Sequence, residues 1–155
     1  MRLALGNDHA GLGLKPHVLR LLADLGHEVV DVGTDTEEPV DFPDVTRDVC
    51  RPVLAGEADR GILLCGTGVG ASIAANKVPG IRAALCHDSY CAHQGVEHDD
   101  VNVLCLGAWI VGPLIAEDVI RSFLGATFST DPDFRRRVEK LHAMERAAAG
   151  QGDEA

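Results

Sequence analysis

The chain has 155 residues, 46% of them hydrophobic, and a formal net charge of −10 at pH 7. This length suits the core of one domain, and the acidic balance excludes the basic patch that nucleic-acid binding needs. No basic segment leads into an apolar stretch at the start, no run reaches the ~20 apolar residues that cross a bilayer, and the five cysteines form no CxxC pair. We therefore expect a cytoplasmic protein with neither a nucleic acid nor a membrane as partner.

Short apolar runs alternate with stretches of helical spacing along most of the chain. The runs are nearly continuous, as is typical of buried parallel strands, and cover residues 3–5, 29–32, 61–65, 81–86 and 101–106. The expected helices cover residues 12–25, 45–55, 69–77, 89–96 and 113–124. This alternation with short loops predicts a single three-layer α/β domain with a five-stranded parallel sheet.

Residues 132–149 predict one extra C-terminal helix. Phe134, Val138, Leu141 and Met144 recur at helical spacing on a charged stretch and form a narrow apolar stripe. The stripe could cover the flank of the sheet or a partner subunit. We expect the domain to span residues 1–149, and the small polar residues 150–155 to form a flexible tail.

Polar residues follow several of the predicted strands. Ligands of open parallel sheets bind outside the carboxyl ends of the strands, so these residues are the first candidates for a site. They are Asn7, Asp8 and His9 after the first strand, residues 65–70 after the third, and His87 and Asp88 after the fourth; His98, Asp99 and Asp100 precede the fifth.

The segment GILLCGTGVGASIAANK, residues 61–77, carries the strongest chemical signal. A buried strand runs into glycines at 66, 68 and 70 and then into a helix, a pattern that brings main-chain N–H groups close to an anion. We expect this turn to favour the thiolate of Cys65. The spacing matches neither a P-loop nor the dinucleotide G-x-G-x-x-G, so a nucleotide site stays an alternative, as does a turn that serves packing alone.

Five ordered motifs resemble the ribose-5-phosphate isomerase B family, which includes galactose-6-phosphate isomerase subunits and allose-6-phosphate isomerase. They are GNDHAG at 6–11, DFP at 41–43, CGTGVGASIAANK at 65–77, GIRAA at 80–84 and HDDVNVL at 98–104. The resemblance implies a Rossmann-like sheet, and a homodimer or dimer of dimers whose subunits share their active sites. The C-terminal helix is then the element that packs on the partner.

The resemblance also implies roles for individual residues in a metal-independent aldose–ketose isomerase. Cys65 would be the base that moves a proton between C2 and C1 through an enediolate, and Thr67 would stabilise the enediolate oxygens with the main chain of Gly66, Gly68, Val69 and Gly70. His98 would open the sugar ring, and Asp8 would bind hydroxyls or assist proton transfer. His9 and Arg137 would hold the phosphate, and Asp99 and Asn102 would contact the sugar. We expect the Cys65 thiol and the His98 imidazole to face one open cleft.

One branch of the family uses as base a glutamate on the helix after the glycine turn; here that position is Ala71, which leaves Cys65 as the base. Three departures affect the choice of substrate. Asp99 stands where an asparagine is common, Trp109 where many members have an arginine, and Pro132-Asp133-Phe134 where G-R-H is common. The substrate can be ribose 5-phosphate or another tetrose, pentose or hexose phosphate.

Two alternatives concern a metal site and the function. Cys86, His87, Cys91, His93 and His98 crowd together in the sequence but show no recognised zinc-ligand spacing, so we expect neither a metal ion nor a cofactor. A non-catalytic sugar-phosphate-binding or regulatory subunit of the same fold is the alternative function.

Overall fold

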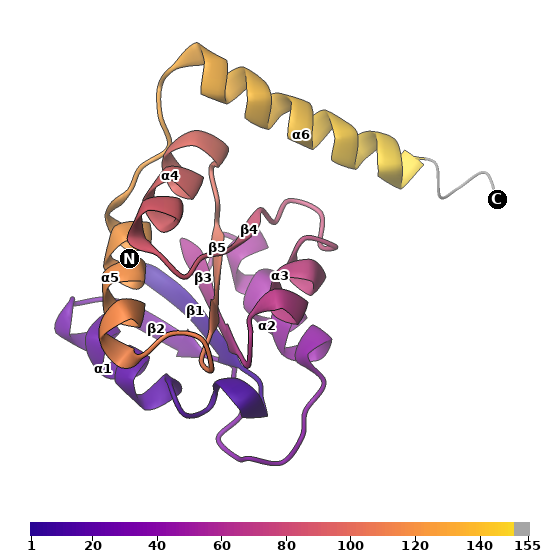
Figure 1. Ribbon diagram of the computed structural model, residues 1–155. Coiled ribbons are helices and arrows are strands. Elements are labelled where there is room, and N and C mark those ends of the chain that lie inside the picture. Colours follow the sequence, from indigo (N-terminus) through magenta and orange to yellow (C-terminus); the bar gives the residue numbers. More distant parts are fainter. Residues whose placement is uncertain (151–155) are drawn as a thin grey trace.

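The computed structural model describes residues 1–150, and in it five parallel strands form one sheet in the order β2-β1-β3-β5-β4 (Figure 1). The prediction of a five-stranded parallel sheet is confirmed. The strands are β1 (Arg2–Asn7), β2 (Glu28–Asp31), β3 (Arg60–Cys65), β4 (Ala83–Leu85) and β5 (Val103–Gly107).

Helices cover both faces of this sheet, as the alternation predicts. Figure 1 shows α1 and α5 on one face and α2 and α3 on the other. The helical elements are η1 (His9–Gly11), α1 (Lys15–Asp24), α2 (Phe42–Leu54), α3 (Val69–Ala75), α4 (Ser89–Asp99), α5 (Pro113–Gly125) and α6 (Pro132–Gly150). Gly150 ends α6, and the rest of the predicted tail, residues 151–155, lies outside the described residues.

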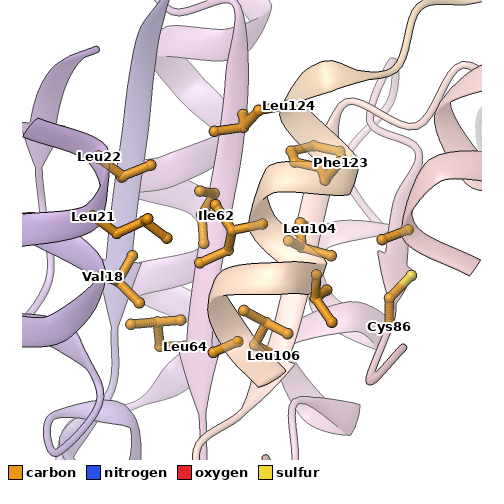
Figure 2. Close-up of a cluster of buried hydrophobic side chains, with 14 of the residues drawn as sticks. Val18, Leu21, Leu22, Ile62, Leu64, Cys86, Leu104, Leu106, Phe123 and Leu124 are labelled. Carbon is orange, nitrogen blue, oxygen red and sulfur yellow. The ribbon is translucent and has the colours of Figure 1, made fainter. Parts of the chain in front are cut away.

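The two faces of the sheet bury cores of different size. Large aliphatic side chains and Phe123 fill the space between β1, β3 and β5 and the helices α1, α4 and α5 (Figure 2). On the other face α2 contributes Val49 and Cys50, and α3 contributes the small residues Ala71 and Ala75. Only residues 66–68 separate the end of β3 from the start of α3.

A buried lysine fixes the loop that follows β2. The Lys15 ammonium group lies 2.7 Å from Asp35 Oδ1 and 2.9 Å from Asp31 Oδ2, and it donates to the carbonyl of Thr34 at 3.1 Å. Asn7, at the end of β1, donates to the same carbonyl. The loop is therefore held against the carboxyl ends of β1 and β2.

Helix α6 packs against α4 and extends beyond the sheet (Figure 1). The predicted helix is confirmed, but only part of its apolar stripe is covered within the chain: Val138 is buried, whereas Leu141 and Met144 are 44% and 68% exposed. Glu145 anchors the far half by accepting from the N–H of Gly80. Across residues 1–150, no helix combines the length and the apolar character of a membrane span.

Candidate active site

The turn between β3 and α3 is closely packed at each of its glycines. Gly68 has a φ of +78°, and a Cβ added there would lie 2.5 Å from a methyl carbon of Leu85. A Cβ at Gly66 would lie 2.8 Å from the indole of Trp109, and one at Gly70 would lie 3.0 Å from the ring of Phe42. The sequence therefore needs glycine here to bring the main chain this close to its neighbours.

Cys65 ends β3 at the mouth of this turn and is half-buried. Burial raises the pKa of its thiol, and the Asp8 carboxylate, which accepts the thiol hydrogen bond, raises it further. The N–H groups of Gly68 and Gly66 lower the pKa, as expected of the glycine turn, but they do not compensate. The net pKa of Cys65 is raised, because desolvation and a neighbouring negative charge outweigh two main-chain dipoles.

Asp8 follows β1 and lies beside Cys65 because β1 and β3 are neighbouring parallel strands. Asn7 pairs with Leu64 in the sheet register, and the N–H of Asp8 donates to the carbonyl of Leu64 at 3.2 Å. The Asp8 side chain is only 5% exposed, and its Oδ1 accepts from the N–H of Gly11 at 2.9 Å. The structure thus confirms that these two candidate residues meet.

His9 and Thr67 complete this side of the site from exposed positions. His9 Nδ1 accepts from the N–H of Val40 at 3.3 Å, which leaves Nε2 as the protonated nitrogen of the neutral ring. Thr67 lies in the glycine turn, where its hydroxyl accepts a long hydrogen bond of 3.4 Å from the N–H of Val69. We call Asp8, His9, Cys65 and Thr67 with the glycine turn the thiol cluster.

The segment after β5 brings Trp109 to the glycine turn. Ala108 donates to the carbonyl of Cys65 at 2.8 Å, and Trp109 donates to that of Gly66 at 3.0 Å. The N–H of Gly107 donates to His87 Nε2 at 3.0 Å. These bonds hold the exposed Trp109 indole against Gly66. The sequence marked Trp109 as a departure from the family pattern but gave no sign of this contact.

His98 lies at the opposite end of the strands, on the side of the sheet where they begin. It is in the last turn of α4, just before β5 begins at Val103, whereas Cys65 pairs with Gly107 at the end of β5. Four steps of ~3.3 Å separate Val103 from Gly107, so the two ends of β5 lie about 13 Å apart. The expectation that Cys65 and His98 face one cleft is therefore wrong within a single chain.

His98 instead gathers with residues of α6. Its ring stacks on Phe134 with centroids 3.8 Å apart and an interplanar angle of 12°, and the Arg137 guanidinium lies 5.5 Å from the centroid of the Phe134 ring. We call His98, Phe134 and Arg137 the imidazole cluster. Arg137 thus lies with His98 and not with His9. The sequence marked Phe134 by helical spacing and as part of a departure from the family pattern, but not by its contact with His98.

The Asn102 side chain makes structural hydrogen bonds within the chain, and its contact with the sugar stays a prediction. Its Oδ1 accepts from the N–H of Arg82 at 2.8 Å, and its Nδ2 donates to the carbonyl of Gly80 at 2.9 Å. Arg82 in turn pairs with Asp100 at 2.6 Å. The side chain therefore ties the start of β5 to the start of β4. Asp99 is exposed beside this network.

A cavity of about 560 Å³ lies away from Cys65, between the edge strand β4, α4 and α6, with Arg82, Cys86, Asp99 and His142 among its lining residues. Within residues 1–150, no three His, Cys, Asp or Glu side chains gather as a set of metal ligands. The thiol cluster combines hydrogen-bond acceptors, main-chain donors and one thiol.

Comparison with known proteins gives a consistent result. The family described as Ribose/Galactose Isomerase matches residues 3–141. Ribose-5-phosphate isomerase B of Escherichia coli is 42% identical over 144 residues, which cover 93% of this chain and 96% of that protein. D-erythrulose-4-phosphate isomerase of Pectobacterium atrosepticum is 41% identical over 130 residues, covering 83% of this chain and 85% of that protein.

The solved structure of ribose-5-phosphate isomerase B from Clostridium thermocellum superposes with a TM-score of 0.92 at 45% identity, covering 96% of this chain and 99% of that chain.

The geometry predicts how Asp8 controls the reactivity of Cys65. Asp8→Asn keeps an oxygen that can accept from Gly11 but removes the charge that raises the thiol pKa. At pH 7 the thiolate fraction should rise, and iodoacetamide should alkylate Cys65 several-fold faster, as followed by peptide mass spectrometry. The pH midpoint of alkylation should fall.

Asp88→Asn is the matched control, because a hydrogen bond to Asp88 raises the pKa of the exposed Cys91. That variant should accelerate alkylation at Cys91 and leave Cys65 unchanged. An unchanged or slower rate at Cys65 in Asp8→Asn would show that the carboxylate does not act on the thiol.

Proposed function

The chain belongs to the Ribose/Galactose Isomerase family, and on this premise we propose that it interconverts a phosphorylated aldose and its ketose through an enediolate, with Cys65 as the base and no metal ion. The observation that carries this proposal is the Cys65 thiol held between the Asp8 carboxylate and the N–H groups of the glycine turn. These are the parts that proton transfer next to a carbonyl needs.

The proton balance uses residues of the thiol cluster. Asp8 accepts the thiol proton, and the Cys65 thiolate removes the proton from C2 of the open-chain aldose, so that the C1 oxygen becomes negative. After a proton moves from the C2 oxygen to the C1 oxygen, the thiol returns its proton to C1 and the carbonyl stands at C2. Asp8 then returns its proton to the Cys65 thiolate, which restores the starting state of the enzyme. A raised pKa makes the thiolate a stronger base once it forms.

Main-chain groups of the turn stabilise the negative charge in this scheme. The N–H groups of Gly66 and Gly68 lower the pKa of the thiol and so favour the thiolate as it forms. Thr67 offers its hydroxyl to the enediolate, and the first N–H groups of α3, at Val69 and Gly70, have no partner inside the helix. Donors placed in this way act as an oxyanion hole.

A partner subunit supplies the imidazole cluster in this proposal. His98 and Arg137 lie at the opposite end of the strands from Cys65. A single chain therefore cannot bring them and Cys65 to one sugar molecule. A two-fold axis can bring the imidazole cluster of each chain onto the thiol cluster of the other, which gives two complete sites per dimer. Both dimer and tetramer contain such pairs.

Exposed apolar residues support the shared site. Val69 and Ile73, on the outer face of α3 directly after the glycine turn, are 48% and 58% exposed, and Leu141 and Met144 of α6 are open as well. Surfaces of this kind are typical of protein contacts. In the assembled site, Arg137 of one chain and His9 of the other hold the phosphate, and Asp99 lies near the sugar.

A cytoplasmic location fits this proposal. The five thiols are free, as expected in a reducing compartment.

Removing the sulfur tests the role of Cys65. Cys65→Ala should lower kcat at least about 10³-fold, since the only base is lost, and should abolish exchange of the C2 proton of ribose 5-phosphate or erythrose 4-phosphate with deuterium from solvent, as measured by NMR. Cys91→Ala, a distant exposed thiol, should retain full activity. Deuterium exchange in Cys65→Ala at the wild-type rate would refute the assignment, and absence of exchange in the wild type would favour a binding subunit.

The role of His98 depends on whether the substrate forms a ring. Ribose 5-phosphate closes a furanose ring through its C4 hydroxyl, but erythrose 4-phosphate cannot, because its C4 oxygen carries the phosphate. His98→Asn should therefore lower kcat/KM for ribose 5-phosphate about 10²-fold and affect the tetrose phosphate much less.

His93→Asn, on the same helix, is the control and should change neither value. Equal losses with both sugars in His98→Asn would mean that His98 holds the substrate and does not open its ring.

A further inference from the structure

Trp109 is the single tryptophan of the chain, and its environment is unusual for so large an apolar side chain. It is 72% exposed although it directly follows the buried strand β5. An indole left open beside the chemical centre of a protein is a candidate ligand contact, because burial against a ligand would remove its apolar surface from water.

The indole is fixed against the turn that carries Cys65. A Cβ at Gly66 would lie 2.8 Å from Trp109 Cε3 and Cζ3 and 3.0 Å from Cη2, so the six-membered ring covers the α-carbon of Gly66. The main chain on either side is pinned by the bonds from Ala108 to Cys65 and from Trp109 to Gly66. A ring held in this way offers a preformed surface, with little conformational entropy to lose on binding.

The side chain that lies against the glycine turn is aromatic, since the Trp109 ring contacts Gly66. Of the basic side chains on β1-side elements, Lys15 is buried between Asp31 and Asp35, and Arg47 of α2 pairs with Asp44. An aromatic face suits the C–H groups of a sugar chain better than its phosphate.

We propose that Trp109 is a specificity-determining residue whose indole packs against the carbon chain of the bound sugar phosphate. The inference rests on the proposed isomerase function and deepens it: the contact selects among sugar phosphates by the length of their carbon chain, while other groups hold the phosphate.

Intrinsic fluorescence tests the contact, since all tryptophan emission of the wild type comes from Trp109. The Cys65→Ala protein binds without turnover and can be titrated with erythrose 4-phosphate and with ribose 5-phosphate. The preferred sugar phosphate should shift the emission of Trp109, and the shift should saturate. Inorganic phosphate, which has no carbon chain, should compete without producing that shift. A saturating sugar phosphate that leaves the emission unchanged would overturn the proposal.

Kinetics of two variants supply the second readout. Trp109→Ala should raise KM about tenfold by loss of an aromatic contact, with a smaller change in kcat, and should alter the ratio of kcat/KM between the two sugars. Trp109→Phe should stay within about threefold of the wild type. Inhibition by inorganic phosphate should be the same in all three proteins.

Other outcomes separate this inference from the proposed function. If Trp109→Ala weakens phosphate inhibition as much as sugar binding, the indole contacts the anion and the proposal is wrong. If it changes the mass of the assembly, measured by light scattering, without changing kcat/KM, Trp109 is a subunit contact. If the wild type turns over sugar phosphates but neither the emission nor the kinetics depend on Trp109, only this inference is wrong. If a sugar phosphate shifts the emission but the wild type shows no turnover, only the isomerase proposal is wrong.

Discussion

The parallel pairing of β1 with β3 is the constraint on which the site depends. Because Asn7 pairs with Leu64, the residues that follow the two strands emerge side by side, and the Asp8 carboxylate meets the Cys65 thiol. A slip of one residue would turn every side chain of the strand to the other face of the sheet. The closely packed glycines then bring main-chain N–H groups onto the same sulfur, so one register sets both the base and its donors.

The sequence was sufficient for the fold and for half of the site. The apolar runs predicted all five strands, because buried parallel strands are continuously apolar, and the rule that ligands lie at the carboxyl ends of strands correctly brought Asp8 and Cys65 together. The same rule gives no reason to place His98 there, since His98 precedes its strand. The family motifs include both Cys65 and His98, but within one chain the fold separates the two residues by the length of β5.

Other features depend on packing that a sequence does not show. The raised pKa of Cys65 follows from burial and from the orientation of Asp8, and the hydrogen bonds of Asn102 arise because the starts of β4 and β5 lie next to each other. The sequence marked Phe134 and Trp109 as departures from the family pattern but did not show what their rings contact. Their places, on the imidazole of His98 and on Gly66, come from the position of α6 and from the bonds that pin the segment after β5.

The central claim is that Cys65 of one chain works with His98 of another. Chains carrying Cys65→Ala and His98→Asn with different affinity tags can be coexpressed and their heterodimer isolated through both tags. One of its two sites would be intact, so about half of the wild-type activity on ribose 5-phosphate should return. If both residues acted within one chain, each site would carry one defect, and a heterodimer as inactive as either parent would contradict the account.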